Sequence, residues 1–431
     1  MICENIGVKD GILQFAGQST VELAQTYGTP LYLMDEDRVR YNCRIYKKAF
    51  EEYFKQGSLP HFASKACAFR QMYRIMAEEK MGVDVVSSGE LYTAWSAGYD
   101  MSLVCFHGSN KTDADIQLGI SLGVGHFIVD NTEDVLAIET FAAEAGIRQK
   151  VLIRVTPGID PHTYAEVATG LVDSKFGVAI ETGQADEITA LTLKQPHIEL
   201  QGFHCHVGSQ VFGEDVFERS AAVMIEFIAH IRDTLGYTAR ILDLGGGYGV
   251  RYVEDDPYLD IHESIRDVGQ TLRECCEKFG VEEPEIILEP GRSIVADAGM
   301  TLYTVGAVKK LPGYKNYVSI DGGMADNPRF ALYKARYTCY VANKMEQEKD
   351  MLCDLVGRCC ESGDVIQEKI HMPSSTERND IVAVCTTGAY NYSMASNYNR
   401  LGRPPVVMLK DGESYIAVKR ESLEDLVQND L

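Results

Sequence analysis

The chain has 431 residues, enough for two or three domains with a buried core. Its formal net charge of −22 would repel a nucleic-acid backbone and an anionic membrane alike, so we expect it to bind neither. No apolar run nears the roughly 18 residues of a membrane span, and the start does not resemble a signal peptide, so we expect a cytoplasmic protein. The cysteines lack zinc-ribbon spacing, so we expect free thiols and no metal site.

Residues 1–35 hold short alternating stretches that end in GTPLYLMDE. From about residue 60 to 293, short apolar runs alternate with amphipathic stretches, which indicates βα units around a parallel sheet. Helical spacing is clear in segments such as 132–145 and 213–234. Eight strands are predicted, at residues 61–65, 83–87, 103–107, 126–130, 151–155, 200–206, 241–244 and 286–289. Eight units fit a closed (β/α)8 TIM barrel better than an open doubly wound sheet of five or six strands.

Beyond residue 299 the pattern changes to short strand-like runs separated by turn residues. The Asp411-Gly412 pair between two of these runs is typical of a tight hairpin turn. We therefore predict an α/β plus all-β protein: a (β/α)8 barrel at residues 36–300 and a second β-sandwich or β-barrel domain formed from both termini, residues 1–35 and 301–431.

In a (β/α)8 barrel the chemistry collects where the strands end. The first predicted strand ends in PHFASKACAF, which places Lys65 at or inside the barrel mouth among apolar neighbours. Loss of hydration there would lower the pKa of the lysine and let its neutral amine form a Schiff base with an aldehyde. A lysine that extends to the rim is the alternative, and Lys111 in HGSNKT is an equally good candidate on local grounds.

The sixth predicted strand ends in GFHCHVGSQ, where His204 and His206 should face one way and Cys205 the other. Two histidines on one face indicate either a metal site or a ring packed against a planar cofactor. For His204 a purely structural position in the core is the alternative.

The next two predicted strands end in LDLGGGYG and IILEPGRS. The glycine turn, Gly245 to Gly247, lets the backbone approach a ligand and offers N–H groups to an anion, although its spacing is not that of a P-loop. Glu289 could pair with a protonated ring nitrogen and Arg292 could bind a phosphate or carboxylate, or both could be ordinary rim residues. An amine, a flat ring, a phosphate-binding turn and an acid together suit pyridoxal 5'-phosphate (PLP).

The β-rich part adds MADNPRFALY, in which Arg329 and Tyr333 are four residues apart, and CESGD. Cys360 lies beside Glu361 and Asp364 in this second motif, so its thiolate is disfavoured and the thiol could donate a proton near neutral pH. An inert thiol in an acidic turn is the alternative.

Together these motifs resemble the alanine-racemase-like, fold-type III PLP-dependent decarboxylases, and most closely the diaminopimelate decarboxylase family. The resemblance covers almost the whole chain. It rests on motifs that occur in the family's order: YGTPLYLMD, FASKA, GVDVVSSGEL, HGSNK, TGLVDSKFG, GFHCHVGSQ, LDLGGGYG, EPGRS, ADNPRFALY, CESGD and TGAYNYSMASNYN.

The resemblance implies decarboxylation of meso-2,6-diaminopimelate to L-lysine and CO2, the last step of lysine biosynthesis. It implies PLP as the cofactor, with Lys65 as the residue that binds it covalently, and a homodimer in which CESGD reaches the neighbouring subunit's barrel so that Cys360 protonates the product. Contacts to PLP are implied for Lys65, His206, Ser209, Gly245, Gly246, Gly247, Glu289, Gly291, Arg292 and Tyr390. Contacts to the substrate are implied for Arg292, Arg329, Tyr333, Glu361 and Tyr390.

Related decarboxylases of D-ornithine, D-lysine or carboxynorspermidine share the fold and cofactor, but two arginines favour a substrate with a distal carboxylate. A PLP-carrier protein lacks the β domain, and an alanine racemase uses a tyrosine in place of the CESGD acid. The chain departs from the family twice: Arg358 stands where a proline is usual, and HTYAEVATG at 162–170 replaces a His-Thr-His-Glu-Tyr stretch.

Overall fold

The structure, a computed structural model, describes residues 1–159, 174–213 and 215–431. These residues form two compact units. The barrel unit comprises Asn42–Gly249 and Leu259–Gly291, and the β unit comprises Met1–Tyr41, Val250–Tyr258 and Arg292–Leu431. Residues 36–41, 250–258 and 292–300 therefore belong to the β unit although they lie inside the predicted range 36–300.

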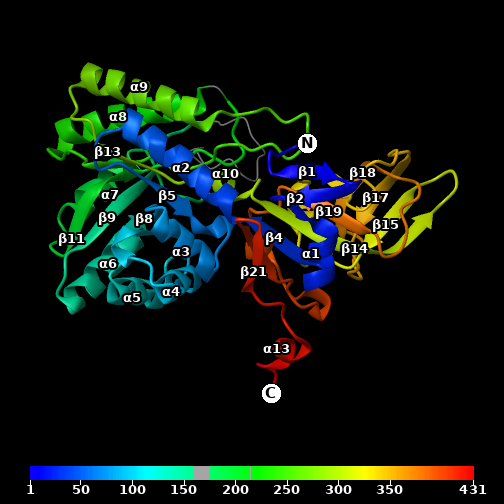
Figure 1. Cartoon of the computed structure of the whole chain (residues 1–431). Coiled ribbons are helices and arrows are strands. Elements are labelled where there is room, and N and C mark those ends of the chain that lie inside the picture. Colours follow the sequence, from blue (N-terminus) through cyan, green and yellow to red (C-terminus); the bar gives the residue numbers. More distant parts are fainter. Residues whose placement is uncertain (160–173, 214) are drawn as a thin grey trace. The chain divides into compact units, whose positions relative to one another are not determined.

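Eight parallel strands form the centre of the barrel unit (Figure 1). They are β5 (Leu59–Ala63), β6 (Gly82–Val85), β7 (Val104–Phe106), β8 (His126–Val129), β9 (Gln149–Thr156), β11 (Ile198–His204), β12 (Ile241–Asp243) and β13 (Glu285–Leu288). The sheet closes because β9 pairs with both β8 and β11, while β5 pairs with both β6 and β13. The predicted (β/α)8 barrel and all eight of its strands are confirmed.

Helices alternate with these strands, as the amphipathic stretches predicted. They are α2 (Glu36–Tyr53), α3 (Arg70–Glu78), α4 (Ser88–Ser96), α5 (Asp113–Leu122), α6 (Thr132–Ala145), α7 (Gln184–Thr192), α8 (Val216–Leu235) and α9 (Ile261–Phe279). Local chemistry fixes their ends. The Asn131 side chain accepts the N–H of Asp134 at 2.9 Å and starts α6, and Gly146 ends it with a φ of 65° that glycine adopts without strain.

The barrel interior is filled by side chains rather than forming a pore. Cys105, Ile128, Leu152, Ile241 and Ile287 come from different strands and form one buried cluster. Because this layer is apolar, the polar residues at the carboxyl ends of the strands form a separate layer above a rigid support.

The β unit is built on a nine-stranded sheet in which the N-terminal strand β4 (Leu31–Asp35) lies inside the C-terminal part. It pairs antiparallel with β14 and parallel with β20, which confirms that both termini form this domain. The other strands of the sheet are β14 (Gly299–Lys310), β15 (Asn316–Ile320), β16 (Cys339–Val341), β17 (Met351–Val356), β18 (Val365–Met372), β19 (Ile381–Cys385), β20 (Val406–Lys410) and β21 (Glu413–Val418).

The Asp411-Gly412 pair joins β20 to β21 as predicted. Both residues have positive φ, 50° and 80°, which is the backbone of the type I′ turns that join twisted strands. A smaller sheet and short helices complete the unit: β1 (Ile6–Lys9), β2 (Ile12–Phe15), β3 (Gln18–Ser19), α1 (Thr20–Tyr27), α10 (Arg292–Val295), α11 (Arg329–Tyr333), α12 (Asn391–Met394) and α13 (Leu423–Val427).

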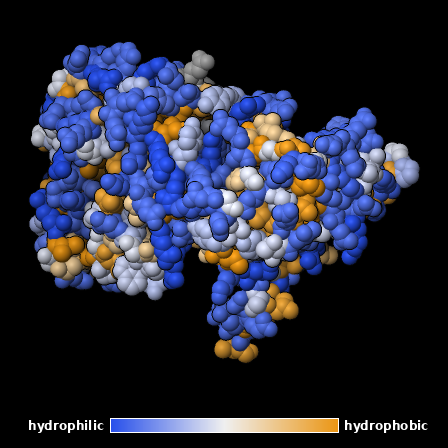
Figure 2. Space-filling model, in the orientation of Figure 1, coloured by the Kyte–Doolittle hydropathy of each residue, from blue (hydrophilic) through white to orange (hydrophobic). Residues whose placement is uncertain are grey.

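The surface seen in Figure 2 is mostly hydrophilic, in keeping with the strongly acidic composition. Hydrophobic side chains gather near the C-terminus, where Leu423 and Val427 of α13 are exposed. Among the described residues, no helix is long and apolar enough to span a membrane.

Candidate active site

Lys65 lies just beyond β5, in the single 3-10 turn Ser64–Ala66. Its side chain is exposed in the barrel unit, so the loss of hydration that the apolar neighbours suggested is not found there. Lys111, the other candidate, is buried and lies 2.8 Å from Asp134, and it also donates to the Gly108 carbonyl at 2.7 Å. Of the two lysines, only Lys65 makes no ion pair with a described residue, so its amine is the one available for chemistry.

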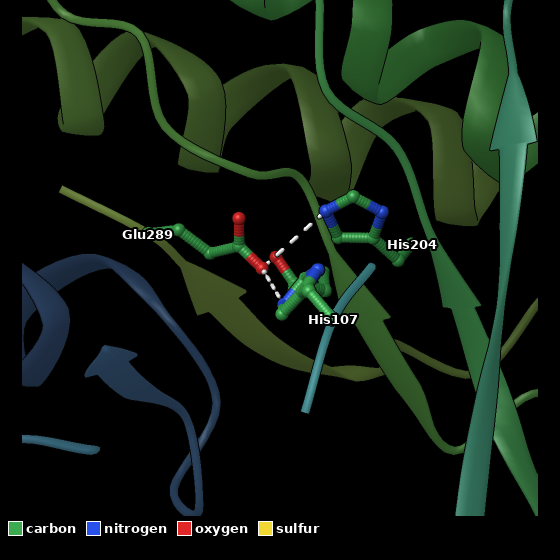
Figure 3. Close-up of side chains that lie close together, drawn as sticks. His107, His204 and Glu289 are labelled. Atoms are coloured by element: carbon green, nitrogen blue, oxygen red, sulfur yellow. Dashed lines mark ion pairs between the residues drawn. The ribbon is translucent and has the colours of Figure 1, made fainter. Parts of the chain in front are cut away.

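Glu289 directly follows β13, and its carboxylate lies between two imidazole rings (Figure 3). Nε2 of His107 lies 2.8 Å from Oε1, and Nε2 of His204 lies 3.3 Å from the same oxygen. Neither contact has the direction of a hydrogen bond, so Oε1 is shielded from solvent without a hydrogen-bond partner among the described residues. Burial alone would raise the pKa of Glu289, but the charges of the two histidines outweigh it and hold the pKa well below its usual value.

Two more carboxyl groups lie in the barrel interior, Asp243 at the end of β12 and Asp84 on β6. The polar atoms of Asp243, Glu289 and the two histidines all lie within 4.8 Å of one another. Burial, and then the charge of Glu289, raise the pKa values of Asp243 and Asp84 well above the usual range. This interior layer therefore combines one ionised carboxylate with two carboxyl groups that favour the neutral acid.

His204 of GFHCHVGSQ faces the interior side and Cys205 faces away, as the strand alternation predicted for these two residues. Cys205 lies with its sulfur 3.3 Å from the hydroxyl of Ser220 on α8, whereas His204 contacts Glu289. His206 comes after the strand, and burial followed by the charge of Lys65 lowers its pKa well below the usual value. A neutral imidazole ring therefore lies close to the lysine amine.

The glycine turn after β12 differs in detail from the expected anion-binding turn. The N–H of Gly245 donates to Oδ1 of Asp243 at 2.9 Å, and the N–H of Gly246 donates to Nδ1 of His206 at 3.3 Å. Among the described residues, Gly247 alone of the three keeps an N–H without a hydrogen bond. Within the described part of the chain, the N–H groups of the first two glycines are therefore used internally, and that of Gly247 is the one left to offer to an anion.

Close approach of neighbouring strands explains why glycine occupies this turn. A Cβ on Gly246 would lie 2.1 Å from the carbonyl oxygen of Glu289, and a Cβ on Gly291 would lie 3.0 Å from that of Ala63. Ser209, the remaining predicted contact to a phosphate, lies in the loop between β11 and α8. The predicted cofactor residues of the barrel unit thus lie in the segments that follow its strands: Lys65, His206, Ser209, Gly245, Gly246, Gly247, Glu289 and Gly291.

The remaining predicted residues lie in the β unit, where two arginines contact one tyrosine ring. Arg292 donates from Nη1 to the hydroxyl of Tyr252 at 2.7 Å, and its guanidinium carbon lies 4.8 Å from the centre of the Tyr390 ring. The guanidinium carbon of Arg329 lies 5.1 Å from the centre of the same ring and 5.4 Å from the centre of the Tyr333 ring. Tyr390 holds this place with a left-handed backbone, φ 69°, which is uncommon for a bulky residue.

Arg329 is buried, with 7% of its surface exposed, and it forms no ion pair with any described residue. Its Nε has no hydrogen-bond partner in that part of the chain either. A buried guanidinium normally has a carboxylate or phosphate partner, because an unpaired charge is costly away from water. The arrangement therefore suits an anionic group of a bound molecule.

The CESGD loop does not form the acidic thiol cluster that the sequence suggested. Cys360 is exposed, and its N–H donates to Oδ1 of Asn399 at 2.8 Å. Asp364 is instead buried, and its carboxylate accepts the N–H groups of Met324 and Cys359, each at 2.6 Å. Asp364 therefore fixes the shape of the loop and leaves the thiol of Cys360 open to another molecule.

Glu361, the other acid of the motif, accepts from the Ser362 hydroxyl at 3.2 Å and from the Gly363 N–H at 3.3 Å. At the position where the family usually has proline, the N–H of Arg358 donates to the carbonyl of Gly322 at 3.0 Å, a bond that proline could not form. The other departure, at 162–170, lies outside the described residues. All cysteines of the described chain are free thiols, as predicted.

His107, Asp84 and Asp243 were not predicted as members of the site. Each lies on or directly after a barrel strand, and this position is the signal that could have identified them. Spacing along the chain could not, because the carboxylate that His204 contacts comes from a strand 85 residues further on.

Comparison with known proteins agrees with this geometry. Residues 36–296 match the family model described as "Pyridoxal-dependent decarboxylase, pyridoxal binding domain". The diaminopimelate decarboxylase of Bacillus subtilis is 41% identical over 421 residues, which cover 98% of this chain and 95% of that protein. The enzyme of Staphylococcus aureus is 40% identical over 422 residues and covers 98% of both.

Among solved structures, diaminopimelate decarboxylase from M. jannaschii in complex with L-lysine superposes with a TM-score of 0.91 at 32% identity, over 99% of this chain and 98% of that one. The barrel and its match to the family model define a fold-type III, pyridoxal-dependent decarboxylase. Within that class, the chain belongs to the diaminopimelate decarboxylase family.

Proposed function

We propose that this chain decarboxylates meso-2,6-diaminopimelate to L-lysine and CO2 with PLP as its cofactor. Full-length similarity to diaminopimelate decarboxylases supports the activity, and the M. jannaschii relative binds L-lysine, the product of the proposed reaction.

The residues at the barrel rim fit PLP. Glu289 has a carboxylate oxygen that is shielded from solvent and lacks a hydrogen bond, so it can accept one from a protonated pyridine nitrogen. Lys65 has an exposed amine without an ion pair, as a covalent bond to an aldehyde requires. Bound PLP would draw electrons away from the substrate carbon that loses CO2.

We assign the protein's own groups the following roles. Lys65 binds the cofactor covalently, the neutral ring of His206 packs on its flat face, and Glu289 keeps its ring nitrogen protonated. The remaining contacts to PLP are assigned to Ser209, Gly245, Gly246, Gly247, Gly291, Arg292 and Tyr390. Because only Gly247 of the glycine turn has an unused N–H, we expect this residue to contribute most of the turn's hydrogen bonding to a phosphate.

The observation that carries the choice of substrate is the unpaired, buried Arg329. A substrate with a second carboxylate supplies the partner that this guanidinium lacks, whereas D-lysine or D-ornithine would leave it unpaired. We assign the distal end of the substrate to Arg292, Arg329, Tyr333, Glu361 and Tyr390.

Cys360 is assigned the proton transfer to the carbon that has lost CO2, since its thiol is exposed and carries a transferable proton. The family resemblance supports a homodimer in which this loop serves the partner subunit's barrel, and an exposed thiol fits that role. We also propose a cytoplasmic location, because free thiols are typical of a reducing compartment.

The experiment is to measure CO2 release from meso-diaminopimelate, D-lysine and D-ornithine with purified, PLP-supplemented protein. We expect release from the first substrate only. Release from D-lysine or D-ornithine, with none from meso-diaminopimelate, would reject the proposed substrate while leaving the reaction type in place.

A further inference from the structure

Asp243 and Glu289 are too close for both to carry a charge. Their carboxyl oxygens lie within 4.8 Å, in the same shielded layer of the barrel, and Asp243 is completely buried. Like charges at such a distance away from water disfavour double ionisation. One proton must therefore remain on the pair at neutral pH.

The unused oxygens of the two residues show where that proton fits. Oδ1 of Asp243 already accepts the N–H of Gly245 at 2.9 Å, whereas Oδ2 has no hydrogen-bond partner among the described residues. Oε1 of Glu289 lacks one as well. A proton on Oδ2 of Asp243 that points toward Glu289 gives both carboxyl groups a hydrogen bond, which two ionised carboxylates could not form with each other.

The surroundings decide which residue keeps the proton. Glu289 has two imidazole nitrogens beside it, at 2.8 and 3.3 Å, and the charges of these histidines favour its ionised form, whereas Asp243 has one backbone N–H. The acids and thiols that act electrostatically on Asp243 are Asp84, Cys105 and Cys205, and none of them is a cation that would favour its charge. The positive charge of Arg154 also interacts with Asp243, but it interacts with Glu289 as well, so it does not favour the charge of Asp243 alone. The ion pair of Arg154 is with Asp130, at 3.9 Å.

We propose that Asp243 is a positioning residue that stays protonated, donates a hydrogen bond to Glu289 and leaves Glu289 as the one negative charge facing the cofactor's ring nitrogen. This inference rests on the proposed binding of PLP. Through Oδ1 the same side chain holds the N–H of Gly245, so Asp243 links the glycine turn to the carboxylate that pairs with the ring.

The test uses two variants of Asp243, one that keeps the hydrogen-bonding groups of the protonated acid and one that removes them. Asp243→Asn keeps an acceptor for Gly245 and a donor for Glu289, and so imitates the protonated acid. Asp243→Leu keeps the branched shape of the side chain, has methyl groups in place of the polar atoms, and removes both. Asp84→Asn serves as the matched control, because it changes another buried carboxyl group of the same layer that pairs with His61, at 3.1 Å.

The first measurement is the infrared difference spectrum of the PLP-free protein at neutral pH, wild type minus Asp243→Asn. We expect the variant to lose the C=O band of a protonated carboxylic acid, and the band to shift when aspartate is labelled with ¹³C. Loss of a carboxylate band instead would overturn the inference. Because no cofactor is present, this result does not depend on PLP binding.

The second measurement is PLP affinity with the pH midpoint of the visible absorbance band. We expect Asp243→Leu to weaken PLP binding about tenfold or more, which is the scale of one hydrogen bond to a charged group, and to move the pH midpoint of the absorbance band. In Asp243→Asn we expect the affinity and the midpoint to stay at the wild-type values. A tenfold weaker affinity in Asp243→Asn would show that the aspartate charge was needed and would overturn the inference. If Asp243→Leu does not fold, Asp243→Asn and the infrared spectrum still decide. Wild-type protein that binds no PLP would reject the proposed function instead.

Discussion

Replacement of Arg329 should weaken substrate binding while it leaves the folding stability of the protein nearly unchanged. In Arg329→Met the side chain keeps an unbranched apolar stem and loses the charged guanidinium group. A charged hydrogen bond to a substrate carboxylate is worth about 1.5–3 kcal/mol, so kcat/KM for meso-diaminopimelate should fall roughly 10- to 150-fold. The loss should appear mainly in KM, because the contact is remote from the bond that breaks.

The stability of the same variant should hardly change. The guanidinium gains about 0.5–2 kcal/mol from the rings of Tyr390 and Tyr333, at 5.1 and 5.4 Å. Its unpaired Nε costs about 1–3 kcal/mol. The two effects oppose each other, so the free energy of unfolding should fall by no more than about 1 kcal/mol.

The assay combines steady-state kinetics with denaturant unfolding of the same preparation. Arg336→Met is the matched control, since Arg336 is half exposed and pairs only at the surface, 3.4 Å from Asp256, so neither quantity should move. A loss of more than about 3 kcal/mol in stability with KM unchanged would show that Arg329 is structural and would refute the argument.

Lys111→Met should lower the free energy of unfolding in urea by about 3–5 kcal/mol, because it leaves the carboxylate of Asp134 buried without its ion-pair partner. A fully stable variant that no longer binds PLP would instead show that Lys111, and not Lys65, binds the cofactor. Cys360→Ala should retain PLP and lower turnover roughly 10²- to 10⁴-fold, with Cys359→Ala as its control, and near-normal turnover would remove Cys360 from the mechanism. Burial raises the pKa of Asp326 to about 7, above its unfolded value, so the protein should lose stability as pH rises from about 4 through about 7, by at most about 1.4 kcal/mol per pH unit. Asp326→Asn should remove that slope in urea unfolding, and an unchanged slope would exclude Asp326 as its source.

The barrel could be predicted from sequence because each of its strands is a short buried run followed by an amphipathic helix. Helix 132–145 was predicted to the residue, since Asn131 and Gly146 give its two ends distinct chemistry. In the β unit, β16 and β18 were missed. In β18 (Val365–Met372) buried and exposed positions do not alternate regularly, so the period-two signal is weak.

The site could be predicted only where one strand end carries a whole motif. The contacts of His107 and Asp243 with Glu289 join three strands, and no spacing along the chain encodes which residues meet inside a closed barrel. The same limit explains why Lys111 could not be set aside from sequence, since its ion pair with Asp134 is not visible there. It also explains why the role of Asp364 in the CESGD loop was not predicted, because its carboxylate binds a backbone N–H and not the thiol of Cys360.

The most direct test of the account is to reduce PLP-supplemented protein with borohydride, digest it and locate the pyridoxyl group by mass spectrometry. We predict a visible absorbance band before reduction and a label on Lys65 alone, with both lost in Lys65→Ala. A label on Lys111, or colourless protein with no label, would contradict the central claim.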